Sequence, residues 1–174
     1  HVREGEVHVL AGENGAGKST LLKMLVGINR PDSGAIRFGG ESVKIATPSD
    51  AEKLGIGMVF QELTLINELT VLENVYMCME YKRCGMLDKK KMRTELRELM
   101  EKYHIQIDPD AIVARLSIAQ KQMVEILKLL VKKPKLLILD EPTSSLASKE
   151  VETLFDIIKN LTANGKTVIF ISHR

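Results

Sequence analysis

The stretch from residue 12 to residue 20 reads Gly12-Glu13-Asn14-Gly15-Ala16-Gly17-Lys18-Ser19-Thr20. It matches the phosphate-binding loop pattern G-x-x-x-x-G-K-[ST]. Glycines let the backbone turn several N–H groups toward one point, because no Cβ atom stands in the way. A helix that begins near Lys18 adds the positive end of its dipole. The stretch therefore predicts a site for nucleotide phosphates, with Lys18 as a mobile cation and the Ser19 hydroxyl as a Mg²⁺ ligand.

The residues on either side of the loop fit such a site. Residues 6–11 (EVHVLA) predict a strand that leads into the loop, and residues 21–26 predict an apolar helix that follows it. Gly27 can end this helix. The alternative is a chance glycine-rich turn, and a strand before the loop with a helix after it argues against that alternative.

The composition is that of an ordinary globular chain. Of its 174 residues, 44% are hydrophobic and 28% are charged, which suits one domain with a core of its own. The net charge of +2 does not indicate a protein that binds nucleic acid. The basic cluster of Lys89, Lys90, Lys91 and Arg93 is interpreted as a solvated helix face rather than a binding patch.

The two cysteines, Cys78 and Cys84, form neither a metal-binding pattern nor a disulfide framework, so a reducing cytosol is expected. Cys78 is expected on a helix, buried or half-buried. No apolar run approaches the ~18 residues that a membrane-spanning helix needs. Both ends of the chain lie close to predicted strands, so the chain is interpreted as a fragment of a longer protein.

The first half of the chain predicts short strands and helices. They are a strand at 35–38, a Gly39-Gly40 turn, a returning strand at 42–45, a helix at 48–54 and a strand at 56–60. Thr47 is the expected cap of the helix, with Pro48 at its first position. The last of these strands delivers Gln61 at its C-terminal end, which is where open α/β sheets bind ligands.

A mainly helical region begins at residue 62. Thr70 and Glu73 form a capping box, and the helix behind them is expected to reach Met79. Asp88 can cap a second helix. The expected buried face of this second helix is Met92, Leu96, Leu99, Met100 and Tyr103. Its Met-rich stripe predicts core packing rather than a cofactor site.

The last part of the chain predicts two helices and two strands. Ser117 and Gln120 form a capping box at the start of the first helix. The apolar face of that helix is Ala119, Met123, Ile126, Leu127 and Leu130. The other helix begins near Lys149, with Val151, Leu154, Phe155, Ile158 and Leu161 facing inward. Between the helices, residues 136–139 (LLIL) predict a strand buried on both faces, and a last strand at 167–172 delivers His173.

The buried strand ends in two carboxylates, Asp140 and Glu141. A carboxylate at the end of the strand next to the loop can hold Mg²⁺ together with Ser19, although a turn or helix cap is the structural alternative for Asp140. Glu141 can polarise an attacking water as a general base. Gln61 and His173 end predicted strands and can contact water, Mg²⁺ or a γ-phosphate; alone, either could simply be a polar residue that closes a strand.

With these motifs in place, the chain resembles the nucleotide-binding subunits of ABC transporters over essentially all 174 residues. Five motifs stand in that family's order: residues 12–20, Gln61, residues 116–120 (LSIAQ), residues 136–141 and His173. The resemblance implies an α/β P-loop NTPase. Its central sheet would be mainly parallel, with a small N-terminal β hairpin region and an inserted α-helical subdomain at residues 62–130.

The resemblance also implies roles for single residues, with ATP and Mg²⁺ as cofactors. Gln61 would lie near Mg²⁺ and the attacking water and link to the membrane partner. Glu141 would be the catalytic carboxylate, and His173 the switch residue on the γ-phosphate. Because the family hydrolyses ATP between two head-to-tail domains, Ser117, Ala119 and Gln120 would complete the site of a second domain.

Two motifs depart from the family's usual pattern. Ile118 and Ala119 replace the two glycines of Leu-Ser-Gly-Gly-Gln, so side chains crowd the approach of a phosphate. Residues 144–147 read Ser-Ser-Leu-Ala where the family often has Ser-Ala-Leu-Asp. Neither change removes a metal ligand or the base.

Residues 116–126 (LSIAQKQMVEI) are similar to the first ATPase half of bacterial sugar importers of the ribose, galactose and xylose type. The resemblance implies an ATPase active as a paired domain, cytoplasmic and peripheral on the inner face of the membrane. Its partners would be membrane-spanning permease subunits and a second ATP-binding domain, in the same chain or in a homodimer. A periplasmic sugar-binding protein would act indirectly, and no nucleic acid is expected.

Two other functions remain as alternatives. One is a non-transport ABC ATPase that acts on ribosomes or DNA, for which a basic surface, a charged linker or a long coiled-coil insertion would be expected. The other is a binding-only ABC module, in which Ile118 and Ala119 prevent productive pairing.

Overall fold

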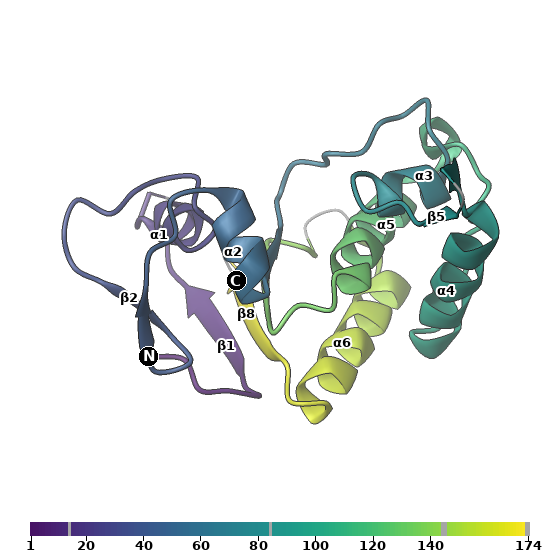
Figure 1. Ribbon diagram of the computed structural model, residues 1–174. Helices are drawn as coiled ribbons and strands as arrows, with labels where there is room; N and C mark the ends of the chain where they lie inside the picture. The colour runs from purple at the N-terminus through teal and green to yellow at the C-terminus, as the bar shows by residue number, and fades with distance from the viewer. Residues whose placement is uncertain (14, 84, 144–145, 173–174) are drawn as a thin grey trace. The chain divides into compact units, whose positions relative to one another are not determined.

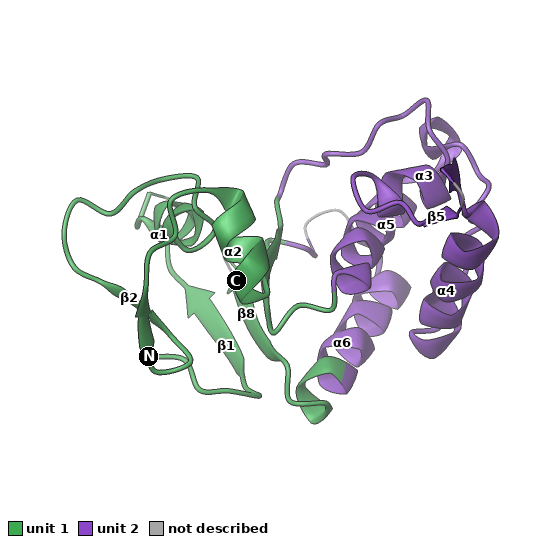
Figure 2. Cartoon of the chain, in the orientation of Figure 1, with its two compact units in different colours: residues 1–60, 133–141, 161–174 green, residues 61–132, 142–160 purple. Residues whose placement is uncertain are grey.

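The computed structural model describes residues 1–13, 15–83, 85–143 and 146–172 (Figure 1). The chain divides into two compact units (Figure 2). Unit 1 comprises His1–Phe60, Lys133–Glu141 and Leu161–Arg174, and unit 2 comprises Gln61–Lys132 and Pro142–Asn160. Each unit is therefore assembled from segments that are far apart in the sequence.

Unit 1 is built on a four-stranded parallel sheet. Its strands are β1 (Val7–Ala11), β4 (Ile56–Val59), β7 (Leu136–Asp140) and β8 (Thr167–Ser172), in the order β1-β8-β7-β4. The expected parallel central sheet is confirmed, and every residue of β7 is buried, as its continuous apolar run predicts. The order corrects one expectation: β7 is not the neighbour of β1, because β8 pairs with both.

Two helices pack on the sheet of unit 1. They are α1 (Lys18–Leu25) and α2 (Pro48–Leu54). Leu22 of α1 and Ala51 of α2 share one buried cluster with strand residues such as Ile138 and Ile169. A small hairpin of β2 (Ile36–Phe38) and β3 (Glu41–Val43) confirms the predicted β hairpin region. Its turn residues, Gly39 and Gly40, both have positive φ, as a type I′ turn requires.

Unit 2 is mainly helical. Its elements are α3 (Val71–Tyr76), α4 (Lys89–Lys102), a 3₁₀ turn at Val113–Arg115, α5 (Ile118–Val131) and most of α6 (Ser148–Ala163). Helix α5 is buried on nearly all sides and packs against α3 and α4. The capping boxes predicted at Thr70–Glu73 and Ser117–Gln120 are both present. No helix in the described ranges is long and apolar enough to cross a membrane.

Unit 2 departs from the sequence expectations at α3 and α6, and it contains one hairpin that the sequence did not predict. Helix α3 ends at Tyr76, and Cys78 lies beyond it, exposed and with a φ of 63°. A short hairpin of β5 (Lys82–Arg83) and β6 (Met86–Leu87) precedes α4, and no alternating pattern in the sequence predicts it. On α6, Ile157 takes the buried place that was expected for Phe155, which is exposed.

Candidate nucleotide-binding site

The loop between β1 and α1 needs glycine at two of its positions. Gly15 and Gly17 have φ values of 83° and 87°, in the left-handed region that residues with a Cβ atom rarely adopt. Gly17 is also the residue that directly precedes α1. At Gly12 a Cβ atom would lie 3.8 Å from the Cβ of Ala16, an ordinary contact, so neither a positive φ nor space requires glycine there.

Lys18 folds back over the beginning of the loop. Its Nζ donates hydrogen bonds to the carbonyl oxygens of Gly12, at 2.6 Å, and Glu13, at 2.9 Å. The ammonium group therefore lies within the loop, beside the N-terminus of α1. No acidic side chain occupies the first turn of α1, so the positive end of its dipole is not neutralised from within the helix. Ser19 and Thr20, in the same turn, are exposed.

The two carboxylates lie at the same edge of the sheet as this loop. Asp140, the buried last residue of β7, is opposite Ile171 of β8, and Ile171 is opposite Leu10 near the end of β1. All these strands are parallel, so their carboxyl ends share one edge. Glu141 follows with a φ of 47°, which is unusual for a residue with a side chain. Such strain is often kept at functional positions.

The residues in unit 1 fit a nucleotide with Mg²⁺. In such sites Mg²⁺ keeps several waters and binds one or two carboxylates together with phosphate oxygens. Ser19 and Asp140 would supply one hydroxyl and one carboxylate at the edge where the loop turns. Among the residues that the structure describes, no group of three or more His, Cys, Asp and Glu could hold a metal ion by itself.

The other predicted site residues belong to unit 2 or are not among the residues that the structure describes. Gln61 is separated from the end of β4 by Phe60, is exposed and is the first residue of unit 2. Asn14 and His173 fall outside the described residues, so their predicted roles stay predictions. The site residues that unit 1 brings together are thus the rest of the loop, Asp140 and Glu141.

The Ser117–Gln120 motif forms the capped start of α5. The Oγ of Ser117 accepts a hydrogen bond of 3.2 Å from the backbone N–H of Gln120, and the Oε1 of Gln120 accepts one of 3.0 Å from the N–H of Ser117. Ile118, which replaces a family glycine, is 62% exposed. The motif therefore presents a helix N-terminus and an apolar side chain at the same place.

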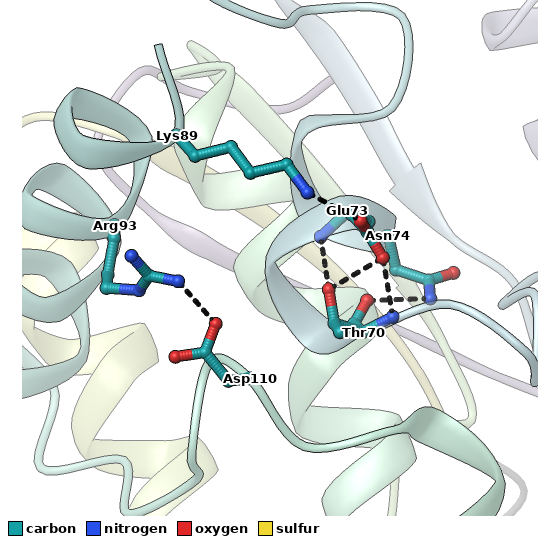
Figure 3. Close-up of polar contacts among 6 residues, drawn as sticks. All are labelled: Thr70, Glu73, Asn74, Lys89, Arg93 and Asp110. Carbon is teal, nitrogen blue, oxygen red and sulfur yellow. Dashed lines mark hydrogen bonds and ion pairs between the residues drawn. The ribbon is translucent and has the colours of Figure 1, made fainter. Parts of the chain in front are cut away.

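The basic cluster on α4 takes part in contacts within unit 2 (Figure 3). Lys89 pairs with Glu73 of α3 at 3.1 Å, and Arg93 pairs with Asp110 at 2.6 Å. The backbone N–H of Thr70 lowers the pKa of the Glu73 carboxyl most, followed by Lys89 and the Thr70 hydroxyl. Lys89 and Arg93 therefore connect α4 to neighbouring segments through ion pairs, whereas the sequence predicts only a solvated helix face.

Sequence reasoning missed the polar residues that anchor the segment behind Gln61. Asn74 is buried in α3, and its side chain bonds the backbone of Ile66 and Thr70. Glu125 is buried in α5 and accepts hydrogen bonds from Thr64. The signal that could have found them is a polar residue at a helix position where the spacing of the neighbouring apolar residues predicts burial, as for Asn74 in VLENVY and Glu125 in QMVEIL.

The fold and the loop define a P-loop nucleotide-binding protein with an α/β sheet. The family model described as ABC transporter matches residues 1–144. The chain therefore belongs to the ABC transporter family.

Curated relatives match over nearly the whole chain. A ribose import ATP-binding protein of Streptomyces avermitilis is 48% identical over 172 residues, which are 99% of this chain and 33% of that protein. A ribose import ATP-binding protein of Rhodococcus jostii is 46% identical, over 98% of this chain and 34% of that protein. A putative ribose/galactose/methyl galactoside import ATP-binding protein of Hahella chejuensis is also 46% identical, with 99% and 34% covered. The chain spans about a third of the length of these relatives.

Solved structures agree with this assignment. A nucleotide-free ATP-binding cassette of an ABC transporter superposes with a TM-score of 0.86 at 27% identity, covering 99% of this chain and 72% of that one. A dimeric ATP-binding cassette in a post-hydrolysis state with ADP and Pi gives a TM-score of 0.84 at 28% identity, with 100% and 77% covered.

Proposed function

We propose that the chain binds and hydrolyses MgATP as an ATP-binding domain of a sugar importer. One observation carries the proposal: a glycine loop with Lys18 at its centre lies at the same sheet edge as Asp140 and Glu141. The relatives are named as import proteins for ribose or for ribose, galactose and methyl galactoside, which supports a monosaccharide as the transported substrate.

The residues of unit 1 would divide the work on the nucleotide. The N–H groups of the loop from Gly12 to Thr20 cradle the phosphates. Lys18 leaves the carbonyl oxygens that it now bonds and turns to the β- and γ-phosphates. Ser19 and Asp140 would hold Mg²⁺. When bound, this ion neutralises negative charge on the phosphate oxygens. Glu141 accepts a proton from the attacking water.

Roles are also proposed for Gln61, for His173 and for the motif at Ser117–Gln120. Gln61 would contact Mg²⁺ and orient the attacking water, and His173 would contact the γ-phosphate. Ser117, Ala119 and Gln120 offer a capped helix N-terminus to the nucleotide of a second ATP-binding domain, in the same chain or in a homodimer. The domain would span residues 1–174, with residues 62–130 as its helical subdomain.

Transport would require further partners. We infer membrane-spanning permease subunits as direct partners, a periplasmic sugar-binding protein as an indirect one, and a place on the cytoplasmic face of the membrane. The names of the relatives, all of them import proteins, support this setting over action on ribosomes or DNA.

A binding-only module is the second candidate, and the exposed Ile118 favours it. A branched side chain at the start of α5 occupies the space through which a partner's phosphates would approach. Turnover by the intact protein decides between the two candidates. If MgATP binds without turnover, and if Ile118→Gly with Ala119→Gly restores hydrolysis, the binding-only function is correct.

The proposed function is tested by titrating the intact protein with MgATP in a calorimeter. We expect micromolar binding that Lys18→Ala weakens at least about tenfold, because a cation on the phosphates is lost. Glu141→Gln should retain binding and lose hydrolysis by about 100-fold or more, because an amide cannot accept the proton of water. Undiminished hydrolysis by Glu141→Gln would refute the catalytic assignment, and unchanged binding by Lys18→Ala would refute the phosphate site.

A further inference from the structure

One face of α5 carries three charged side chains at spacing i, i+4 and i+7, and all three contact the segment that follows Gln61. Lys121 donates from Nζ to the Oδ1 of Asn67 at 3.0 Å. Lys128 donates from Nζ to the Oγ1 of Thr64 at 3.2 Å. Between the two lysines on the helix lies Glu125. Because residues at this spacing share one helix face, the segment 64–67 runs along α5.

Glu125 is the central contact of this face. Its side chain is buried, with 7% of the residue exposed. The Oε1 accepts hydrogen bonds from the backbone N–H of Thr64 and from its hydroxyl, the latter at 2.8 Å. Its Oε2 lies 4.0 Å from the Nζ of Lys128. A buried carboxylate is costly unless it is bonded and paired, so Thr64 and Lys128 together make this position tolerable.

The same segment is held from its other side. The side chain of Asn74 accepts from the N–H of Ile66 at 2.8 Å and donates to its carbonyl oxygen at 3.0 Å. The N–H of Ala114 donates to the carbonyl oxygen of Asn67 at 2.9 Å. The chain from Thr64 to Asn67 is therefore fixed to α3, to α5 and to the 3₁₀ turn, all within unit 2.

The direction of this segment links two motifs. Thr64 follows Gln61 by three residues and contacts the middle of α5, whereas Asn67 contacts Lys121 close to the start of α5. Helix α5 begins at the cap formed by Ser117. The backbone behind Gln61 and the start of the Ser117–Gln120 motif are thus attached to one rigid helix, whose residues 117 and 125 lie about 12 Å apart at 1.5 Å per residue.

We propose that Glu125 is a positioning residue for ATP hydrolysis. It holds Thr64, and through Thr64 the backbone that presents Gln61, in a fixed place on the helix that Ser117 caps. It does not touch the nucleotide. This inference rests on the role proposed above for Gln61.

The test measures steady-state ATP hydrolysis by the intact protein. Glu125→Met removes both acceptor bonds, and we expect kcat to fall about tenfold while the KM for ATP changes less than about twofold. Glu125→Gln keeps a carbonyl oxygen for Thr64, so kcat should return to within about threefold of the wild type. Thr64→Val removes only the hydroxyl and should lower kcat about threefold. Thr64 is exposed, so this substitution should leave the fold intact. Glu98→Met, on the exposed face of α4, is the matched control and should have the kcat of the wild type.

A double-mutant cycle with Gln61→Ala identifies the route by which Glu125 acts. If Glu125 acts through Gln61, Gln61→Ala with Glu125→Met should be no slower than Gln61→Ala alone, within about twofold. Hydrogen–deuterium exchange at the amide of Thr64 should be faster in Glu125→Met than in the wild type. This exchange rate reports directly on the lost hydrogen bond between the Thr64 amide and Glu125, and it does not depend on catalysis.

The outcomes separate this inference from the proposed function. A wild-type kcat in Glu125→Met beside a slow Gln61→Ala overturns the inference and leaves the proposed function standing. Independent effects that multiply in the double variant also overturn the inference. A wild-type kcat in Gln61→Ala refutes the role proposed for Gln61, and with it the route proposed for Glu125.

Discussion

Gly27 is the residue at which the backbone of unit 1 has no room for a side chain. It has a φ of 72°, and a Cβ atom placed on it would lie 2.4 Å from the carbonyl carbon and oxygen of Thr47. The N–H of Gly27 and that of Ile28 bond the last carbonyls of α1, which is a Schellman motif. Thr47 caps α2, so the end of α1 and the start of α2 touch through this glycine.

We therefore expect Gly27→Ala to lower the free energy of unfolding by about 3 kcal/mol or more, since left-handed strain and an overlap with backbone add up. Gly34→Ala is the matched control, because Gly34 has a φ of 91° with nothing within 4 Å of its added Cβ, and should cost only about 1 kcal/mol. Urea unfolding of the intact protein measures both. Equal losses would contradict the proposed overlap with Thr47.

At His104, a substitution by glycine is expected to stabilise the fold. It has a φ of 55° and ends α4 in a Schellman motif, in which the N–H of Ile105 bonds the carbonyl oxygen of Met100 at 2.9 Å. Glycine adopts this conformation without strain, so His104→Gly should raise the free energy of unfolding by about 0.5–1 kcal/mol. His104→Ala keeps the strain and should give no such gain. Thermal unfolding of both variants checks this, and a gain in His104→Ala alone would count against it.

At the scale of the element, helix starts are the best predicted features. Thr47, Thr70 and Ser117 each accept a bond from the third residue of the helix, whose side chain bonds back. These contacts are local, so spacing alone predicts them. The hairpin of β5 and β6 could not be found this way, because strands of two residues carry no period. On α6, either Phe155 or Ile157 can join Leu154 and Ile158 in an apolar stripe of helical period, so the period alone does not decide which of the two is buried.

The capping box of α3 predicts a dependence on pH. Hydrogen bonds from Thr70 and the pair with Lys89 hold the pKa of Glu73 below its ordinary value of 4.5 in the folded state. Its ionised form therefore stabilises the fold above about pH 4.5, and this contribution is lost as the pH falls through the lower, folded value.

Glu73→Gln keeps the cap and removes the titration. Its free energy of unfolding should consequently fall less than that of the wild type between pH 6 and about pH 3.5. Glu98→Gln, which removes an exposed carboxylate that caps no helix, is the control. Parallel losses in Glu73→Gln and the wild type would contradict this account.

At the scale of the whole molecule, the sheet of unit 1 shows where sequence reasoning ends. Each of its strands could be located from apolar runs, and so could the loop and the carboxylates at the strand ends. The strand order β1-β8-β7-β4 could not be predicted, because an apolar run indicates that a strand is buried but does not indicate which strands lie beside it. The anchors Glu125 and Asn74 were missed for a related reason: their partners, Thr64 and Ile66, are fixed by tertiary contacts and not by spacing.

The central place of β8 can be tested with one type of substitution. Val168 of β8 is 0% exposed, whereas Val9 of β1 is 55% exposed. Val168→Ala should therefore lower the free energy of unfolding by about 2 kcal/mol, and Val9→Ala by no more than about 0.5 kcal/mol. Chemical denaturation of the two variants supplies the comparison. Equal effects would argue against a buried β8 beside an open β1.

The place of β8 also has a consequence during protein synthesis. Among the described strands, β1 pairs only with β8, and Val7 lies opposite Val168, 161 residues further along. At ~5–20 residues per second the ribosome needs roughly 8–30 seconds to make that interval. During this time the edge of the nascent β1 that β8 will cover stays open, and open edges of apolar strands are places that chaperones bind and that aggregate. Translation that stalls before residue 167 would leave β1 without its partner.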